Sequence, residues 1–259
     1  MTAVLSEQRT DLRERVWDAL HTVIDPELDE PVTDLGFVTE CTVTVTGATR
    51  IRLRLPTAFC SPNFAYLMVS DAHDAVLALP GVTALTLTLG DHSDSDKINA
   101  GIAAHLGFAD AFPAETTTEL HELRAVFRRK AHQAFVERVC TALVREHGRS
   151  ADDLPALRLE DLPPGRLRDG LLRRRTDLGL SVDPSDPVCV DEQGVRWPPE
   201  ELPRRLRFAR AVRVSIDGNA HFCRGLLATR YPGAETVQAE RHHELLSLTP
   251  IPDHDRSAS

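Results

Sequence analysis

The stretch that decides the fold lies between residues 41 and 55 and reads Cys41-Thr42-Val43-Thr44-Val45-Thr46, Gly47-Ala48-Thr49-Arg50 and Ile51-Arg52-Leu53-Arg54-Leu55. Apolar and polar side chains alternate strictly on both sides of Gly47, which is the period-two pattern of half-buried strands. A short connection that contains glycine favours antiparallel pairing of two such strands. The stretch therefore predicts a hairpin whose strands cover residues 37–46 and 50–55.

Helical spacing of apolar residues flanks this hairpin on both sides. Residues 7–23 repeat apolar side chains every three or four positions, with Ser6 as the expected N-cap, and residues 63–79 do the same before Pro80-Gly81. Residues 82–89 alternate again, and residues 97–106 suit a further short helix. This order predicts a two-layer α/β unit in which helices cover one face of a three-stranded sheet.

The rest of the chain predicts a mainly helical second part. One long helix is expected from Thr117 to about Gly148, followed by an acidic linker rich in proline at residues 152–165. Beyond it we expect helices at residues 167–175, 200–209 and 219–228, a hairpin at 188–197 and a strand at 212–216. The fold class is thus α+β, with a first domain at 1–112, a mixed, mainly helical domain at 113–251 and a disordered tail at 252–259.

Charge and composition exclude several classes of protein. The formal net charge is −9, and residues 1–115 carry 7 Lys and Arg against 17 Asp and Glu, whereas the remainder carries 23 against 22. An acidic first half disfavours nucleic acid as a partner, because such affinity comes from neutralising phosphates. No apolar run is long enough for a membrane span, and Met1 to Glu7 lack the basic start and apolar core of a secretory signal. We therefore expect a cytoplasmic protein that acts on neither nucleic acid nor membrane.

Cys60 is the first candidate functional residue. The five cysteines are odd in number, scattered and without a C-x-x-C pair, so we expect reduced thiols rather than a disulfide framework or a closed zinc ribbon. Cys60 lies between the second strand and the second helix, where a helix N-terminus would lower the pKa of its thiol. A thiolate can bind iron or attack an electrophile, and the alternative is a buried loop cysteine.

Carboxylates accompany this thiol in the first half of the chain. Asp25 and Glu27 follow the first helix, and carboxylate and thiolate donors together can hold a transition metal. Asp34-Leu35-Gly36 is a good turn, in which Gly36 supplies a backbone angle that other residues resist. Acidic residues are also common in such turns simply because they solvate well and cap N–H groups.

Three further groups are weaker candidates. Asp91, His92 and Asp94 follow the third strand, where His92 can supply a metal ligand, or the segment can be a solvated acidic loop. Cys223 stands close in sequence to His221, and in the helix expected there it is favoured as a packing residue. The arginine-rich clusters at 173–175 and 204–213 fit solvated helix faces or a surface that docks on an acidic protein.

With these residues in view, residues 8–110 resemble the iron-sulfur cluster assembly domain of the SufT and PaaD type. The resemblance rests on four motifs: Val23-Ile24-Asp25-Pro26-Glu27, Asp34-Leu35-Gly36-Phe37, Pro56-Thr57-x-x-Cys60 and Leu79-Pro80-Gly81-Val82. It implies Cys60 as the ligand or transfer thiol, with Asp25 and Glu27 as the acidic motif beside it and Asp34, Gly36 and Thr57 in structural turns. This chain departs from the family pattern at Ser61, which stands between Cys60 and Pro62.

A narrower resemblance concerns the segment Phe59-Cys60-Ser61-Pro62-Asn63-Phe64 with the later Asp91-His92 and Ile98-Asn99-Ala100-Gly101. It is similar to a subgroup associated with bacterial multicomponent diiron monooxygenases. The resemblances together imply a maturation factor, not an enzyme, that binds iron or a labile iron-sulfur cluster and engages a client metalloenzyme or other assembly proteins. The C-terminal domain is expected to bind the client or to form a homodimer.

Two alternatives remain beside this expectation. The first is a metal-independent folding chaperone or interaction protein for an oxygenase subunit, and the second is a thiol enzyme with Cys60 as nucleophile. One thiolate cannot complete a tetrahedral iron site. A metal site at Cys60 therefore needs either a second subunit that contributes another Cys60, or carboxylate, histidine and water from the same chain.

Overall fold

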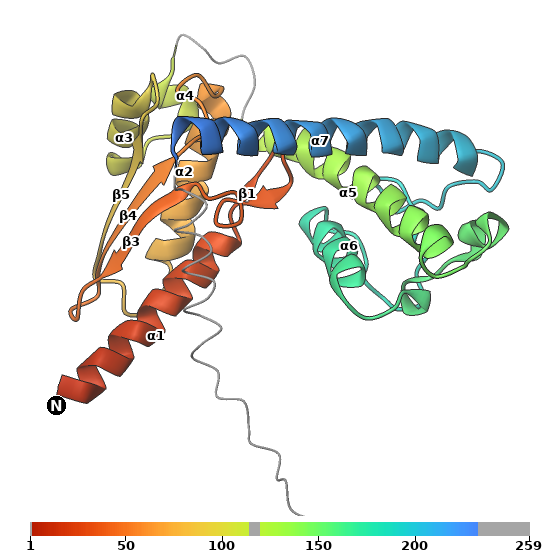
Figure 1. Ribbon diagram of the computed structural model, residues 1–259, viewed down its shortest axis with the longest axis horizontal. Coiled ribbons are helices and arrows are strands. Elements are labelled where there is room, and N and C mark those ends of the chain that lie inside the picture. Colours follow the sequence, from red (N-terminus) through yellow and green to blue (C-terminus); the bar gives the residue numbers. More distant parts are fainter. Residues whose placement is uncertain (1, 114–119, 233–259) are drawn as a thin grey trace, which may run out of the picture.

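The computed structural model describes residues 2–113 and 120–232, with side chains described from residue 11 onward. Helices dominate, and a single three-stranded sheet lies in the N-terminal part (Figure 1). The α+β fold class expected from the sequence is confirmed. The predicted tail at 252–259 lies outside the described residues.

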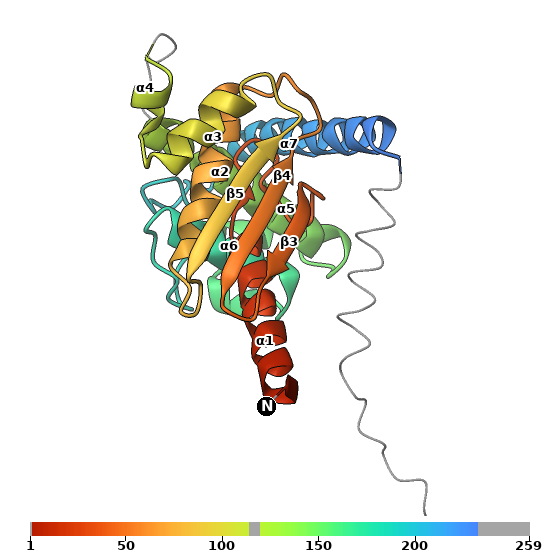
Figure 2. The same cartoon turned by 90° about the vertical axis from the view of Figure 1, so that its left-hand side faces the viewer.

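The N-terminal part is a two-layer unit. Its elements in chain order are α1 (Thr2–His21), β1 (Ile24–Asp25), β2 (Glu30–Pro31), β3 (Val38–Val43), β4 (Ala48–Arg54), α2 (Pro62–Leu77), β5 (Ala84–Gly90), α3 (Ser95–Ala103) and α4 (Phe108–Ala111). The sheet order is β3-β4-β5, antiparallel between β3 and β4 and parallel between β4 and β5, as Figure 2 shows from the sheet side. α2 provides the crossover that a parallel pair requires. This arrangement confirms the hairpin and the third strand.

The hairpin depends on one glycine. Gly47 has a φ of +84°, and a Cβ atom at this position would lie 1.9 Å from the carbonyl oxygen of Gly81. No other residue type combines that backbone angle with so close an approach. At the N-terminal end of the unit, the helix begins at Thr2, so the prediction that Ser6 is its cap is wrong.

The C-terminal part has its own apolar core. Its elements are α5 (Leu120–Arg145), two 3-10 turns η1 (Ala151–Ala156) and η2 (Leu159–Asp161), α6 (Arg166–Asp177) and α7 (Leu202–Arg230). The segment predicted to be a linker is instead part of this core, because Leu154, Leu157, Leu159 and Leu162 are all buried there. The proline and aspartate residues of this segment are typical of a linker, but its leucines pack into the C-terminal core.

The largest correction concerns α7. The sequence predicts two helices separated by a strand at 212–216, but the chain forms one helix from Leu202 to Arg230. Valine and isoleucine alternate with polar residues there, which imitates a strand. Arg213 nevertheless pairs with Glu137 of α5 at 2.5 Å and with Asp217 one turn further along at 2.9 Å, so contacts with α5 override the local pattern.

The predicted hairpin at 188–197 is reduced to a single bridge. Val190 and Arg196 form one isolated antiparallel pair around a turn at Gly194, and neither residue belongs to a strand. Within the described residues, no helix is both long enough and apolar enough to cross a membrane.

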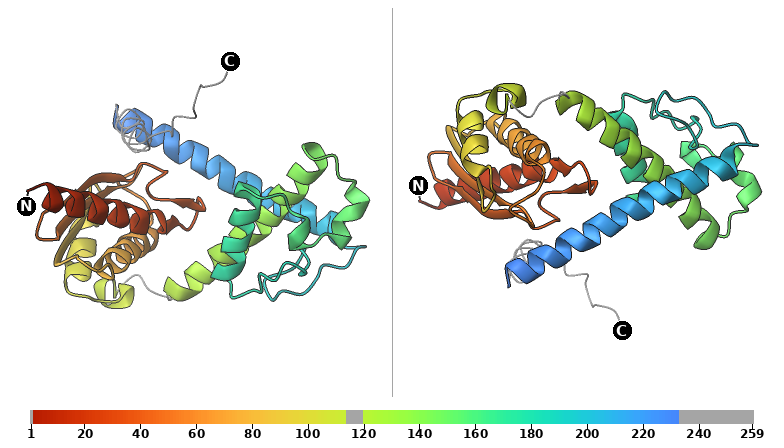
Figure 3. Two further views of the ribbon diagram at one scale, coloured as in Figure 1. Left: turned by 90° about the horizontal axis from the view of Figure 1, so that it is seen from below. Right: turned by 90° about the horizontal axis from the view of Figure 1, so that it is seen from above.

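α7 connects the two parts of the molecule. Leu202, near its start, is buried in the C-terminal core, whereas Ala220 and Leu227 are buried in the core of the N-terminal unit. Figure 3 shows the helix running from one part to the other, so that its end lies beside the N-terminal elements.

Candidate functional site

Asp25 shapes the turn between β1 and β2. Its Oδ1 atom accepts the backbone N–H groups of Glu27 and Leu28, each at 2.9 Å, and the side chain is 7 % exposed. Such local bonds are what aspartate contributes to tight turns. Among the described residues, no hydrogen bond to the second oxygen, Oδ2, accompanies these two.

The electrostatics of Asp25 oppose its burial. Loss of solvent raises its pKa from 3.8 to about 6, and the neighbouring charges of Glu27 and Glu30 add to the increase, while the two N–H bonds oppose it. The carboxyl group is still mainly ionised at pH 7. A nearly buried negative charge therefore lies beside other acidic groups.

Cys60 lies in the loop between β4 and α2. Thr57 accepts the N–H of Phe59 at 3.2 Å, and the N–H of Ser93 donates to the carbonyl of Ala58 at 2.9 Å. α2 then begins at Pro62, directly before the predicted range of 63–79. The thiol is half-buried against the core of the N-terminal unit, so it is not sealed inside that core.

The predicted lowering of the Cys60 pKa is wrong. Burial raises the pKa of the thiol to about 12, and the negative charges of Asp25, Cys223 and Glu27 contribute to the rise. These effects exceed the lowering by the backbone hydrogen bond of Thr57. In the free protein the thiol is protonated at neutral pH, and a bound cation would have to displace that proton.

His92 holds the Cys60 loop in place. Its Nε2 atom lies 2.9 Å from the carbonyl oxygen of Cys60, while Nδ1 accepts the N–H of Asp94 at 3.1 Å. The imidazole is 6 % exposed. Both ring nitrogens thus contact backbone groups, so the geometry gives His92 a positioning contact with the Cys60 loop, and its role as a metal ligand stays a prediction.

Of the predicted turn residues, Thr57 lies in the Cys60 loop, whereas Asp34 and Gly36 occupy a separate loop. Gly36 has a φ of +75°, and Asp34 pairs with His21 at 3.3 Å. The structure places neither residue among the groups that perturb Cys60. Asp25 and Glu27, by contrast, both act on its thiol.

Cys223 of α7 joins the same neighbourhood. One turn before it, Asn219 donates from Nδ2 to Oε1 of Glu27 at 3.2 Å. Burial raises the pKa of Cys223 to about 11, and the charges of Asp25 and Glu27 contribute, while Arg224 lowers it. No local pattern places a residue near position 220 beside one near position 25, because that pairing depends on the path of α7.

The five cysteines divide into two groups. Cys41, Cys140 and Cys189 are buried, and Cys140 and Cys189 approach each other to 3.7 Å between their Sγ atoms inside the C-terminal core. Cys60 and Cys223 are partly exposed and share the acidic neighbourhood. All five are free thiols, as the sequence predicts.

The possible metal donors of this neighbourhood are Cys60, Cys223, Asp25 and Glu27, and they do not form an assembled metal centre. Two thiols and two carboxylates are suitable ligands for a thiophilic transition metal. In the part of the chain that the structure describes, no group of three or more His, Cys, Asp or Glu side chains is gathered closely enough to hold a metal ion. A cation would relieve the repulsion among these groups as it draws them together.

A separate cleft does not contain the thiols. It has a volume of about 380 Å³ and is lined by residues of the β1–β2 turn, α2, α5 and α6, including Arg124, Arg128 and Arg173. Ion pairs, such as Arg124 with Asp71 at 2.5 Å, neutralise part of its charge. We therefore assign the cleft to the junction between the two parts of the chain.

Comparison with known proteins matches part of the chain to a family model. Residues 13–87 match the model of a family described as iron-sulfur cluster assembly protein, which covers less than a third of the chain. No curated protein and no solved structure matches the chain. The match supports the general family for the N-terminal unit, and it includes Asp25, Glu27 and Cys60 but not Cys223.

Proposed function

We propose that this protein is a metallocentre maturation factor that binds iron or a labile iron-sulfur cluster through Cys60 and delivers it to a client metalloenzyme. The observation that carries the proposal is a half-buried thiol beside two carboxylates, inside a domain that matches iron-sulfur cluster assembly proteins. The resemblance of the Cys60 segment to monooxygenase-associated proteins favours a diiron monooxygenase as the client. The metal is cargo in this proposal, not a resident cofactor.

The environment of Cys60 is suited to reversible carriage. Each negative group that raises the thiol pKa also attracts a cation, so binding exchanges a proton for a metal ion. Such a site releases its cargo when protons return or when a client offers better ligands. A thiol enzyme is less well supported, because a nucleophilic cysteine needs a lowered pKa and Cys60 has the opposite.

The test is metal binding by oxygen-free protein. We expect full-length wild type given ferrous iron and sulfide to retain iron after desalting, and Cys60→Ala to retain little. Cys41→Ala is the matched control, since Cys41 is buried in β3 of the same unit. Equal iron content in wild type and Cys60→Ala would end the proposal.

A metal-independent role has one observation in its favour. Phe208, Val214 and Phe222 of α7 are exposed, as is Phe59 next to Cys60, at 84 %. Exposed apolar side chains of this size mark protein contacts when they gather on one surface. If Cys60→Ala restored client activity as well as wild type in cells lacking the protein, the folding-chaperone role would replace metal carriage.

A further inference from the structure

Two cysteines of the C-terminal core are in direct contact. The Sγ atoms of Cys140, on α5, and Cys189, in the segment that leads to α7, lie 3.7 Å apart, and each residue is only 2 % exposed. A disulfide needs its two sulfurs at about 2.05 Å. The two thiols are therefore reduced neighbours, whose sulfurs need to approach by less than about 2 Å to form a bond.

Backbone contacts on both sides of Cys189 hold it against α5. The N–H of Trp197 donates to the carbonyl of Cys189 at 2.9 Å, and the N–H of Val188 donates to the carbonyl of Leu157 at 2.9 Å. The Sγ atom of Cys189 also lies 3.8 Å from the carbonyl oxygen of Leu154. These neighbours are all buried in the C-terminal core, so the contact between the two sulfurs belongs to the packed interior of this part of the chain.

A small cavity leads from solvent to one of the two sulfurs. Its volume is about 160 Å³, and it lies between α5, η1 and α7. Cys140 lines this cavity, whereas Cys189 lies behind Cys140 and does not. Because a water molecule takes about 30 Å³ in the liquid, the cavity admits a molecule of the size of hydrogen peroxide. The other residues that line it are Glu137, Thr141, Val144, Arg145, Leu154 and Leu206.

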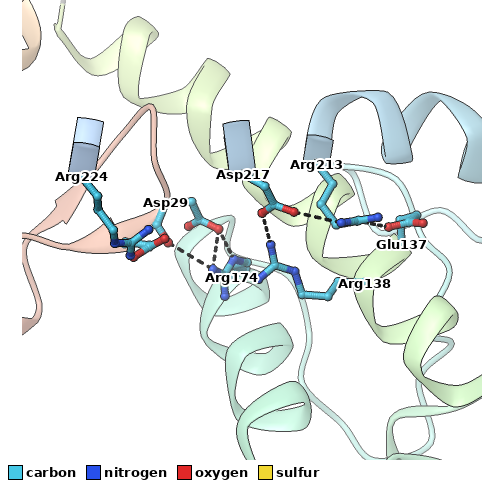
Figure 4. Close-up of polar contacts among 8 residues, drawn as sticks. Asp29, Glu137, Arg138, Arg174, Arg213, Asp217 and Arg224 are labelled. Atoms are coloured by element: carbon cyan, nitrogen blue, oxygen red, sulfur yellow. Dashed lines mark hydrogen bonds and ion pairs between the residues drawn. The ribbon is translucent and has the colours of Figure 1, made fainter. Parts of the chain in front are cut away.

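The lining of the cavity makes Cys140 the group that an oxidant modifies. Glu137 is already bound at both carboxylate oxygens, because it pairs with Arg213 of α7 at 2.5 Å and accepts the hydroxyl of Thr141 at 2.8 Å. Figure 4 shows the pair of Glu137 and Arg213 together with Asp217. Of the seven residues that line the cavity, Cys140 alone has a side chain that peroxide oxidises under mild conditions.

We propose that Cys140 and Cys189 form a disulfide when a small hydroperoxide enters this cavity, and that the bond locks α5 to the segment that leads to α7. The inference goes beyond the proposed function, because it involves neither Cys60 nor a metal. The pair is a modification site of the C-terminal core, and its two oxidation states give that core two levels of stability.

The chemistry balances in two steps. The sulfur of Cys140 attacks one oxygen of hydrogen peroxide, the O–O bond breaks, and the thiol proton leaves with the departing oxygen as water. The sulfur of Cys189 then attacks the sulfenic acid of Cys140, the S–O bond breaks, and the second thiol proton leaves with that oxygen as water. Two thiols and one peroxide thus give one disulfide and two waters, with sulfur oxidised and oxygen reduced.

The environment of Cys140 sets the pace of this reaction. The hydrogen bond with Cys189 and burial raise the pKa of the Cys140 thiol well above its ordinary value. Thiolate, not thiol, is the nucleophile, so the first step is slow. We therefore expect a response to sustained exposure to peroxide rather than enzymatic turnover.

The bond would stabilise the C-terminal core. It joins residues 49 positions apart, and a cross-link over such a loop restricts the unfolded chain. Cys140 lies in the middle of α5, while Trp197, bonded to the backbone of Cys189, lies just before α7. The disulfide therefore fixes the start of α7 to α5.

The experiment maps disulfides in the full-length protein. Wild type, reduced and desalted, is treated with hydrogen peroxide until Cys60 is oxidised, and the remaining thiols are alkylated in denaturant. Peptide mass spectrometry without reductant should then detect a peptide that joins Cys140 to Cys189, and dithiothreitol should separate it. Cys41, buried in β3, is the internal control and should be recovered in alkylated form. Recovery of Cys140 and Cys189 as alkylated thiols, or oxidation of Cys140 without linkage to Cys189, overturns the proposal.

Two variants test the route through the cavity. In Cys189→Ser, peroxide should leave Cys140 as a sulfenic acid that dimedone captures. In Cys140→Ser, Cys189 should stay a thiol, because it does not line the cavity. Oxidation of Cys189 in Cys140→Ser at the wild-type rate overturns this route. The map of wild type requires neither variant, so it decides the proposal even where a variant fails to fold.

Urea unfolding measures the lock. The midpoint of the disulfide form should exceed that of reduced wild type by about 1 M, and dithiothreitol should reverse the gain. Cys189→Ser given the same peroxide treatment is the matched control and should show no gain. An equal or lower midpoint for the disulfide form overturns the lock. Iron retention by reduced protein still decides the proposed function, because Cys60 takes no part in this bond.

Discussion

At the scale of single residues, Asp25 is held in a position that costs stability. Its two N–H bonds and its burial keep the carboxylate fixed, while Glu27 and Glu30 add like charge. A side chain chosen for the fold alone would avoid a buried negative charge here. Natural sequences keep such residues where function requires them.

The expected consequence is a stabilising substitution. The raised pKa of Asp25, about 6 against 3.8, means that its contribution is fully present below pH 3.8 and is lost as pH rises through 6. Asp25→Asn keeps the oxygen that accepts the two N–H bonds but carries no charge. Its free energy of unfolding, relative to wild type, should therefore rise by about 2.4 kcal/mol between pH 4 and pH 7.5.

Urea unfolding at a series of pH values measures this difference. Asp18→Asn, at an exposed position of α1, is the control and should change stability little at any pH. Under the proposed function, the same Asp25→Asn variant should retain less iron than wild type after desalting. A pH-independent difference from wild type would show that the charge of Asp25 is not what strains the turn.

At the scale of elements, the prediction from the sequence differs most from the structure at α7. Val212, Val214 and Ile216 alternate with polar residues, and Asp217-Gly218-Asn219 has the composition of a turn. What makes the segment helical is its contact with α5, where Arg138 pairs with Asp217 at 2.5 Å. Such contacts join residues far apart in the sequence, so local patterns contain no trace of them.

Substitution of Gly218 tests the continuous helix. Gly218 is exposed in the interior of α7, and a Cβ atom there meets nothing within 4 Å. Gly218→Ala should stabilise the protein by about 0.5–1 kcal/mol, because alanine restricts the unfolded chain and favours a helix. The midpoint of urea unfolding gives the measurement.

Gly47→Ala is the opposite control, since it places a Cβ atom against Gly81 at a positive φ. It should be strongly destabilising. Gly225→Ala, a second open position of α7, should repeat the gain of Gly218→Ala. Loss of stability in both α7 variants would contradict the continuous helix and support a break near residue 218.

Other elements could be predicted because their information is local. The hairpin at 41–55 alternates with period two, and α2 and α5 show apolar residues at helical spacing, so each pattern indicates its own structure. The segment at 152–165 could not be predicted in this way. Its buried leucines have no regular period, and only the C-terminal core that they join explains them.

At the scale of the whole molecule, a buried ion pair links α6 to the β1–β2 turn. Arg174 donates from Nε to Asp29 at 2.7 Å, and its guanidinium lies 3.8 Å from the centre of the Phe135 ring. Burial raises the pKa of Asp29 and lowers that of Arg174, despite their mutual attraction. The loss of hydration is therefore large, and the pair is valuable mainly because each charge neutralises the other.

Substituting one partner of this pair should lower the free energy of unfolding more than substituting both partners. Arg174→Met leaves Asp29 buried and unpaired, which should cost about 3–5 kcal/mol of unfolding free energy. The double variant Asp29→Asn with Arg174→Met should recover most of that loss, because asparagine tolerates the φ of +55° at position 29. Chemical unfolding of wild type, both single variants and the double variant completes the double-mutant comparison. Equal loss in the single and double variants would assign the effect to packing on Phe135 instead.

Only part of the candidate site could be predicted, because only that part depends on local sequence information. Asp25, Glu27 and Cys60 lie in short motifs on one folding unit, so the sequence could bring them together. Cys223 lies 163 positions beyond Cys60, and a cysteine in a helix is usually a packing residue. Only the path of α7 across both cores shows which face of the helix it occupies.

The distance along the chain between α7 and the β1–β2 turn also sets the order in which these elements form during synthesis. Asn219 and Glu27 are 192 residues apart, and Arg224 and Glu30 are 194 apart. N-terminal units fold first as a chain leaves the ribosome. The sheet and the Cys60 loop are therefore made while α7 is still being translated, and the contacts of α7 with the β1–β2 turn form after them.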